Sequence, residues 1–227
     1  QKAIEIDDRL ISAKIILGET YEKYNDFDKA MEIYKETLNQ SEKFGDKKNT
    51  SISTRKIGVI YLSRDREYEK ALDYFKRSLE LSMLIDDKSL ISKALNNIGA
   101  TYGHQNNDDK EIEYYTRALQ VAEGIGDKYN IAFVSNNIGD VYKYKDDLDT
   151  ALDYYERSLA IREEIGDKHG MGYSLGNIGI VYHDKGDYDT ALDYYEKSLA
   201  IDEGLGNKRG MSTILGNIGI VYKTKGD

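Results

Sequence analysis

The sequence of 227 residues contains no cysteine, no proline and no tryptophan. Without cysteine, the chain forms no disulfide bond, no thiolate metal site and no cysteine nucleophile. This agrees with a reducing compartment, and we therefore expect a cytoplasmic location. Without proline, helices can continue without a break from one glycine to the next. The absences thus favour a reduced, helix-rich chain.

The chain also lacks a long apolar run and a signal-peptide pattern, so a transmembrane span is not expected. Its formal net charge of −9 argues against a general partner of nucleic acids or anionic membranes. With 40% hydrophobic and 32% charged residues, the composition is typical of a folded, soluble chain. The start at Gln1 and the end within a repeat indicate a piece of a longer protein.

Motifs of catalysis and cofactor binding are absent from the sequence. The three histidines, His104, His169 and His183, have no metal-ligand spacing, and no phosphate-binding or nucleophile-elbow motif occurs. We therefore expect no metal, no cofactor and no enzymatic activity.

A block of 40 residues recurs along the chain. The tripeptide Asn-Ile-Gly begins at Asn97, Asn137, Asn177 and Asn217, and weaker copies contain Gly18 and Gly58. Gly58 and Gly99 are 41 residues apart, which places one inserted residue near 63–67. A fixed period of this size predicts a solenoid in which each repeat packs on its neighbours.

Each repeat predicts two antiparallel helices, which we name A and B. In the fourth repeat, Asp127 is a candidate N-cap, and Val134, Ile138 and Val141 form one helical stripe. A second stripe lies between 148 and 159, so the whole chain predicts eleven helices and no strand. We expect a single all-α array, an α-solenoid with a right-handed superhelix. Its repeats are 1–45, 46–86, 87–126, 127–166 and 167–206, with a half repeat at 207–227.

Every A helix contains a glycine, although glycine costs a helix about 1 kcal/mol relative to alanine. The compensating gain predicted here is the close approach of an aromatic side chain from helix B. The glycines are Gly18, Gly58, Gly99, Gly139, Gly179 and Gly219. The aromatic residues are Tyr34, Phe75, Tyr115, Tyr155 and Tyr195.

This pattern resembles the tetratricopeptide repeat family over essentially the whole chain. The family's apolar residue before the small residue matches Leu17, Ile57, Ile98, Ile138, Ile178 and Ile218. Its tyrosine three residues later matches Tyr21, Tyr61, Tyr102, Tyr142, Tyr182 and Tyr222. The 40-residue period and the missing closing proline are similar to the long-helix type of Pins-type spindle adaptors, kinesin light chains and bacterial sensor proteins. The resemblance implies that A helices line a concave groove that holds peptides.

Asparagines form the main candidate site. Stacked A helices would bring Asn97, Asn137, Asn177 and Asn217 into a ladder whose amides either bind a peptide backbone or stabilise the stacking of repeats. We expect Asn96 and Asn136 to face the groove more directly. The candidate peptide-binding residues are Arg55, Lys93, Asn96, Asn97, Asn136, Asn137, Asp140, Lys143, Asn177, His183 and Asn217.

The charged candidates do not favour one sign of ligand. Arg55 and Lys93 resemble in part the carboxylate-gripping arrangement of chaperone cochaperones, and the alternative is a set of solvated basic residues. Asp140, Lys143 and His183 add charges of mixed sign farther along the groove.

Repeat 3 departs from the pattern, because Asp108 and Glu111 replace an aromatic or leucine and an alanine. A buried carboxylate without a partner is costly, so this turn is either loosened or reached by a basic side chain, unless it reflects drift in a tolerant array.

Three functions are compatible with this sequence. The first is a non-catalytic scaffold that binds a peptide or partner segment in its concave groove. The second is a sensory or regulatory domain of a larger signalling enzyme, such as a histidine kinase or nucleotide cyclase. The third is self-association through the last A helix, about 208–225, whose residues Ile218, Val221 and Tyr222 are expected to lack a covering B helix.

Overall fold

The computed structural model describes residues 2–226, with side chains from Leu10 onward. These residues form eleven α-helices and one short π-helical turn and contain no strand, which confirms the all-α prediction. The helices are α1 (Lys2–Lys23), α2 (Phe27–Phe44), α3 (Lys47–Ile60), α4 (Tyr68–Leu84), α5 (Lys88–His104), α6 (Asp108–Gly124), α7 (Lys128–Tyr144), α8 (Leu148–Ile165), α9 (Lys168–Asp184), α10 (Tyr188–Leu205) and α11 (Lys208–Lys225).

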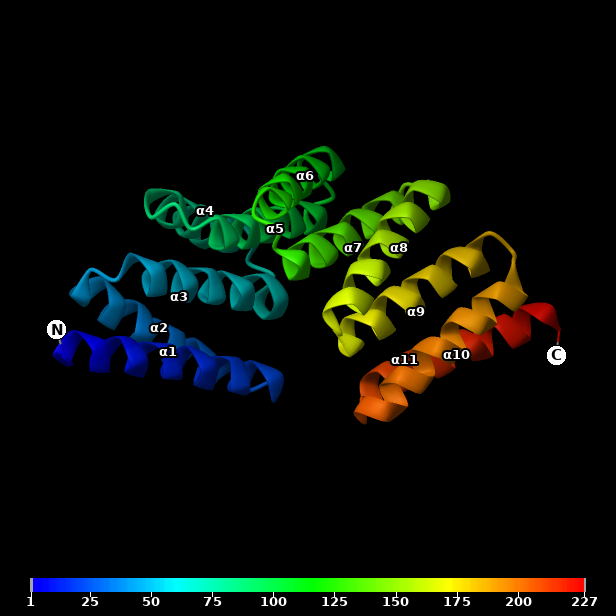
Figure 1. The fold of residues 1–227 in the computed structure, drawn as a ribbon, viewed down its shortest axis with the longest axis horizontal. Helices are drawn as coiled ribbons and strands as arrows, with labels where there is room; N and C mark the ends of the chain where they lie inside the picture. Colours follow the sequence, from blue (N-terminus) through cyan, green and yellow to red (C-terminus); the bar gives the residue numbers. More distant parts are fainter. Residues whose placement is uncertain (1, 227) are drawn as a thin grey trace. The chain divides into compact units, whose positions relative to one another are not determined.

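The chain divides into two compact units, Gln1–Val121 and Ala122–Asp227, with the division inside α6. Within unit 1, each helix from α1 to α5 packs on the next, and α3 also contacts α1 and α5. Within unit 2, consecutive helices from α7 to α11 pack on one another, and α9 contacts α11 (Figure 1). Odd-numbered A helices are therefore neighbours within a unit, as a solenoid requires.

Helix boundaries follow the predicted caps. The side chain of Asp127 caps α7 by accepting a hydrogen bond from the backbone N–H of Asn130 at 3.1 Å. The preceding Gly126 has a φ of 65°, a left-handed conformation in which glycine avoids the steric cost of a side chain. The same sequence of left-handed glycine and capping aspartate joins α8 to α9 at Gly166 and Asp167. These turns keep the connections short and the helices antiparallel.

The inserted residue of repeat 2 appears as a π-helical turn at Tyr61–Asp65. The backbone N–H of Arg66 donates to the carbonyl of Tyr61, which closes a turn five residues long instead of four. A π-turn is the usual way for a helix to absorb one extra residue without breaking. The A helix of repeat 2 thereby returns to register before α4 begins.

The recurring glycines lie under the aromatic rings of the B helices, as predicted. A Cβ atom built on Gly139 would lie 2.6 Å from Cε1 of Tyr155, and one on Gly179 would lie 2.6 Å from Cε1 of Tyr195. The same overlap occurs between Gly18 and Tyr34, Gly58 and Phe75, and Gly99 and Tyr115. Nothing lies within 4 Å of the Cβ position of Gly219, because no aromatic ring covers it. In these five repeats, the free-energy cost of glycine in the A helix is therefore offset by the packing of an aromatic ring against it.

Tyrosine pairs and serine hydrogen bonds join the two helices of a repeat. Tyr142 of α7 stacks on Tyr154 of α8 with ring centroids 5.8 Å apart, and three other repeats contain an equivalent pair. Buried Ser158 of α8 donates to the carbonyl of Ala132 in α7 at 2.8 Å. In repeat 3, where alanine replaces the serine, Ser92 of α5 donates instead to the carbonyl of Ala118 at 2.9 Å. Packing thus accounts for most of the tyrosines.

Repeat 3 accommodates its acidic residues by two local changes. The Asp108 side chain is exposed, while Glu111 is half-buried, and its carboxylate lies where a Cβ of Gly103 would be. The corresponding A-helix residues in repeats 4 and 5 are Lys143 and His183. A second glycine therefore provides the space for Glu111, a compensation that the sequence analysis did not foresee.

The apolar face of α11 is less open than the sequence suggested. Val221 is fully buried and Ile218 is half-buried against α10, so the expectation that both lack cover is wrong. Tyr222 is exposed as expected, and Leu215 and Ile220 are exposed with it. An A helix is thus covered by the B helix of the preceding repeat as well as by the B helix of its own repeat.

Candidate functional site

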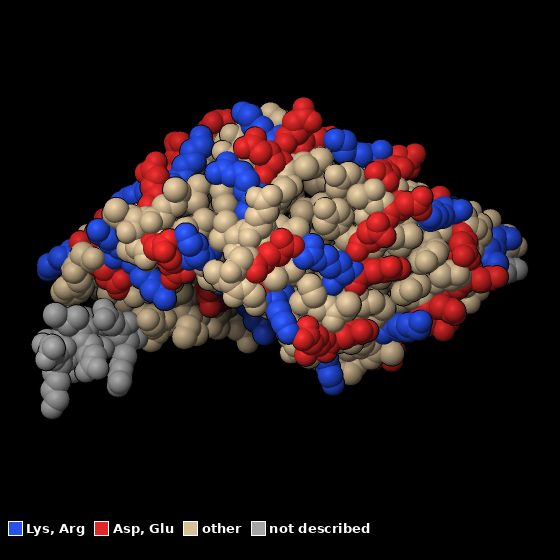
Figure 2. All heavy atoms as spheres, turned by 45° about the horizontal axis from the view of Figure 1, so that its top comes forward, with Lys and Arg blue, Asp and Glu red and all other residues tan. Residues whose placement is uncertain are grey.

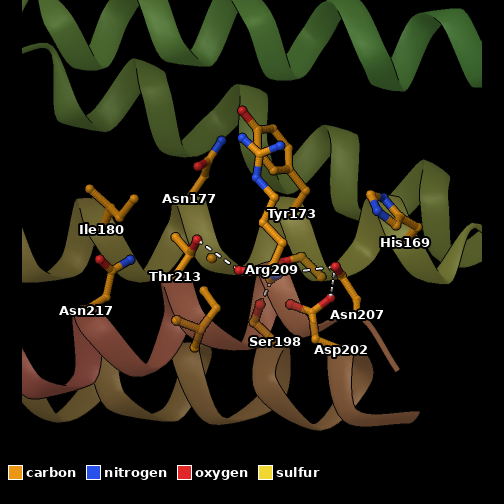
Figure 3. A pocket seen from close by; sticks show the side chains of 14 residues that line it. His169, Tyr173, Asn177, Ile180, Ser198, Asp202, Asn207, Arg209, Thr213 and Asn217 are labelled. Carbon is orange, nitrogen blue, oxygen red and sulfur yellow. Dashed lines mark hydrogen bonds between the residues drawn. The ribbon is translucent and has the colours of Figure 1, made fainter. Parts of the chain in front are cut away.

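A hollow of about 470 Å³ lies in unit 2 between α9 and α11, with α10 beneath it (Figure 3). Polar side chains from all three helices line it: Tyr173, Asn177, Ser198, Asp202, Thr213 and Asn217. Ile180 and Ile214 add an apolar wall. The cavity is therefore amphipathic and is bounded by two neighbouring A helices.

Small residues on α9 create this space. Gly172 and Gly176 line the hollow, and in the preceding repeat Ala132 and Asn136 occupy the equivalent positions on α7. The Asn136 side chain is 1% exposed and fills the interval between α7 and α9. Loss of that side chain at Gly176 leaves the next interval open.

Two ladder asparagines of unit 2 line the hollow. Asn177 is mostly buried, and its Nδ2 donates to Oδ1 of Asp140 at 3.3 Å. Asn217 is half-buried on α11 and lines the same cavity. Asn137, on α7, is also half-buried. The structure thus brings Asp140 and Asn177 into contact and places Asn217 beside the latter.

Asn96 and Asn136 do not face an open groove, contrary to the prediction. They are 5% and 1% exposed, and Oδ1 of Asn136 accepts a hydrogen bond from Ser174 of α9 at 3.4 Å. Ser174 belongs to the next A helix, so the register of Asn136 places its side chain between α7 and α9. Asn97, in unit 1, is half-buried, and its Nδ2 has no hydrogen-bond partner among the described residues.

A buried carboxylate connects α7, α8 and α9. The hydroxyl of Tyr155 donates to Oδ1 of Asp140 at 2.7 Å. Burial raises the pKa of Asp140, and the Tyr155 hydrogen bond and Lys143 oppose this shift. The pKa of Tyr173 is also raised, by partial burial of this half-exposed side chain and by the nearby Asp140, and its hydrogen bond with Asn177 opposes the shift. Asp140 therefore organises the asparagine and tyrosine side chains on the A-helix face of unit 2.

Two basic side chains of unit 1, the candidate Arg55 and its neighbour Lys56, lie beside acidic residues of the same unit. Lys56 lies 2.8 Å from Glu19 and 3.2 Å from Glu22. Burial lowers the pKa of neighbouring Arg55, and Glu19 and Glu22 oppose this effect. Lys93 is half-buried on α5 and is itself engaged within the chain. An acidic ligand at this position would have to displace these intrachain partners.

Lys143 and His183 lie at the end of their helices next to the A–B turn. Lys143 approaches the ring of Tyr144, with its Nζ 5.1 Å from the ring centroid. His183 contacts Tyr188 at the start of α10, and its Nδ1 lies 3.1 Å from Asp184. The structure therefore directs His183 toward its own B helix, while Lys143 lies beside Tyr144 and acts on the charge of Asp140.

Two features of unit 2 were not predicted from the sequence: a pair of exposed aromatic residues and an exchange of charge between repeats. Tyr129 and Phe133 on α7 are exposed and stack at 6.5 Å, an unusual arrangement for large apolar side chains without cover. Seven residues after the B-helix aromatic, small residues at Ser41, Ser82 and Ala122 give way to Arg162 and Asp202. The exchange would have been visible in the sequence if equivalent positions of the repeats had been searched for differences as well as for shared residues.

Surface charge does not single out one sign of partner. On the face shown in Figure 2, basic and acidic side chains are interspersed, and neither sign forms a continuous area. Several exposed pairs join successive repeats, including Lys225 with Asp189 at 2.7 Å. Such exposed pairs stabilise a protein by about 0–1 kcal/mol each. In the part of the chain that the structure describes, no helix is long and apolar enough to cross a membrane.

Comparison with solved structures reveals similar helix arrays at low sequence identity. BtubC (BKLC) from P. vanneervenii is 22% identical with a TM-score of 0.70, and the match covers 90% of this chain and 89% of that one. A Rap protein complexed with competence and sporulation factor is 16% identical with a TM-score of 0.80, covering 93% of this chain and 62% of that one. The Rap conjugation gene regulator of the plasmid pLS20, in complex with the Phr* peptide, is 17% identical with a TM-score of 0.79, covering 92% and 56%.

These structural similarities establish the fold, and sequence comparison establishes the family. Curated protein sequences give no significant match. The tetratricopeptide repeat family matches five overlapping stretches of the chain, at residues 9–83, 49–124, 90–164, 130–204 and 170–227. Their starts are 40 or 41 residues apart, in step with the helix pairs and with the inserted residue of repeat 2. The chain belongs to the tetratricopeptide repeat family.

Proposed function

We propose that this chain is a non-catalytic scaffold whose unit 2 binds a peptide segment across the A helices α7, α9 and α11. The observation that carries the proposal is the hollow between α9 and α11, which is lined by Asn177 and Asn217. An amide side chain both donates and accepts hydrogen bonds, as does a peptide backbone. Asparagines at a 40-residue interval therefore match an extended chain that crosses successive helices.

Aromatic side chains next to the asparagines support this proposal. Tyr129, Phe133 and Tyr173 are between 42% and 57% exposed on α7 and α9. Aromatic residues supply large contact areas in binding sites, and here they lie on the same helices as Asn137 and Asn177. A bound segment would thus gain hydrogen bonds from the amides and apolar contacts from the rings.

Two of the similar structures are complexes, one with a factor and the other with a peptide. These are the Rap protein with competence and sporulation factor and the Rap regulator with the Phr* peptide. This chain spans 62% and 56% of their lengths. The likeness adds support for peptide recognition by a helix array, and the regulatory activity of those proteins is not transferred.

The proposal is tested by selecting peptides from a random display library with the whole chain as bait. The double variant Asn137→Ala/Asn177→Ala should bind a selected peptide at least about tenfold more weakly, because hydrogen bonds are lost in the groove. The control is Asn39→Ala, on the exposed side of α2, which should leave binding unchanged. Calorimetric titration and a urea melt are made on the same variants.

Two results would contradict the proposal. One is a library selection that yields no peptide above background. The other is a double variant with intact affinity and a large loss of stability, which would assign the asparagines to the stacking of repeats.

A further inference from the structure

The interval between α7 and α9 contains a guanidinium that belongs to the chain itself. Arg162 of α8 is 6% exposed, and its Nε donates to Oγ of Ser158 at 3.0 Å. Its Nη1 lies 3.0 Å from Oδ2 of Asp167, the N-cap of α9. A Cβ on Gly170 would overlap this guanidinium, so glycine at this position leaves room for the cation beneath α9.

The next interval, between α9 and α11, has the same surrounding serine and glycine, which we call the frame, but no arginine on α10 beneath it. Asp202 stands at the position of Arg162, and the N-cap Asp167 is replaced by Asn207. Ser198 and Gly210 repeat Ser158 and Gly170. The site therefore keeps its small residues and its serine, while the charge at its floor changes from positive to negative.

The Asp202 carboxylate has only part of its hydrogen-bonding capacity filled. The residue is 5% exposed and lines the hollow, and its Oδ1 accepts from Nδ2 of Asn207 at 2.7 Å. Among the described residues, no hydrogen bond reaches Oδ2 and no ion pair reaches either oxygen. A buried carboxylate without a cation is costly, and a cationic ligand would remove that cost.

We propose that the hollow binds a guanidinium or ammonium group from a basic side chain of the bound peptide, with Asp202 as its counter-charge. This inference rests on the proposed peptide-binding function and names the chemistry of one subsite. The chain demonstrates in the preceding repeat that the frame fits a guanidinium, since Arg162 occupies it there. Tyr173 and the two asparagines at the rim would contact the stem and the backbone of the ligand.

Arg209 is a basic side chain of the chain itself that could compete with a ligand for Asp202. It lines the hollow at its exposed rim, and Figure 3 shows its side chain extending away from Asp202. Replacement by glutamine should therefore leave cation binding intact or strengthen it, because a like charge is removed from the entrance. Loss of binding in Arg209→Gln would contradict this arrangement.

The direct test uses N-methylguanidinium and methylammonium as probes of the whole chain by two-dimensional NMR. Saturable shifts should appear at the side-chain amide of Asn207 and the backbone amides of Gly210 and Gly172, with dissociation constants on the order of millimolar. Sodium chloride at equal ionic strength and acetate should not reproduce them. Shifts that grow linearly, or that sodium chloride reproduces, would overturn the inference.

Two variants separate a specific site from a folding defect. Asp202→Asn should weaken N-methylguanidinium binding about tenfold or more, since a charge-assisted hydrogen bond is replaced by a neutral one. The double variant Asp202→Arg/Asn207→Asp copies the arrangement of the preceding repeat, so it should fold and bind neither probe. Unchanged probe binding in the double variant, with its spectrum otherwise intact, would contradict the subsite.

The peptide selection distinguishes failure of the cation subsite from failure of the proposed peptide-binding function. Selected peptides should contain lysine or arginine at one fixed position, and that preference should disappear with Asp202→Asn. Peptides that depend on Asn177 but show no basic position would overturn the inference and leave the proposed function standing. Probe binding at Asp202 without any selected peptide would support the cation site and contradict the peptide function.

Discussion

Alanine substitutions at two equivalent glycines should differ in their effect on stability. Gly139 and Gly219 occupy the same position of their A helices, but only Gly139 lies beneath a B-helix ring. A methyl group at position 139 would lie 2.6 Å from Cε1 and 2.7 Å from Cδ1 of Tyr155. At position 219 it would meet no atom within 4 Å. The pair thus separates helix propensity from packing.

The two effects have known sizes. Alanine stabilises a helix by about 1 kcal/mol relative to glycine, and this gain applies at both positions. Carbon atoms pack at about 3.5–4.0 Å, so the methyl at 139 overlaps the ring by roughly 1 Å. Tyr155 is fully buried and bonded to Asp140, and relief of such overpacking costs about 1–3 kcal/mol. Gly139→Ala should therefore be net destabilising by about 1 kcal/mol, and Gly219→Ala should be neutral or stabilising.

Urea unfolding followed by circular dichroism measures both variants against the parent chain. The midpoint should fall for Gly139→Ala and stay or rise for Gly219→Ala, and Gly139→Leu should fall further. If Gly139→Ala unfolds at the same or a higher urea concentration than Gly219→Ala, ring packing does not explain the recurring glycines.

Three further predictions concern pH, local opening and association. Because burial raises the pKa of Asp140, ionisation of this carboxyl group destabilises the fold at a pH above the pKa of an ordinary carboxyl group, and this cost disappears as the pH falls. Asp140→Asn should therefore raise the melting temperature most at neutral pH and least near pH 3. A gain in melting temperature that is constant with pH would contradict this. Amide hydrogen exchange should be faster at 106–115 than at 146–155, because repeat 3 contains Glu111 in place of alanine; equal protection would mean that Gly103 accommodates the carboxylate fully. Exposed Leu215, Ile220 and Tyr222 on α11 should cause concentration-dependent association in light scattering, and a strictly monomeric chain at high concentration would exclude self-association through this face.

The fold could be predicted from the sequence because its signals repeat. A glycine at intervals of 40 or 41 residues, an aromatic residue in the next helix and an aspartate at most turns specify helix pairs independently of distant contacts. Even the inserted residue of repeat 2 was visible as a 41-residue spacing, and it forms the π-turn at Tyr61–Asp65. The right-handed superhelix and the repeat boundaries stay predictions.

The candidate site was less predictable, because periodicity identifies a helix face but not the element that covers it. Asn96 and Asn136 have the same spacing as exposed groove residues, yet both are buried, and Asn136 is bonded to Ser174 of the next A helix. Arg162 and Asp202 were missed for the opposite reason, since their importance lies in the difference between repeats. Only the structure shows that one fills the interval beneath α9 while the other leaves the next interval open.

The central claim is that a peptide lies across the A helices of unit 2. Hydrogen–deuterium exchange of the whole chain, with and without a peptide selected from the random library, maps its position directly. Protection should appear on α7, α9 and α11 around Asn137, Asn177 and Asn217, and not on the exposed faces of α8 and α10. Protection confined to α8 and α10, or to unit 1, would contradict the account.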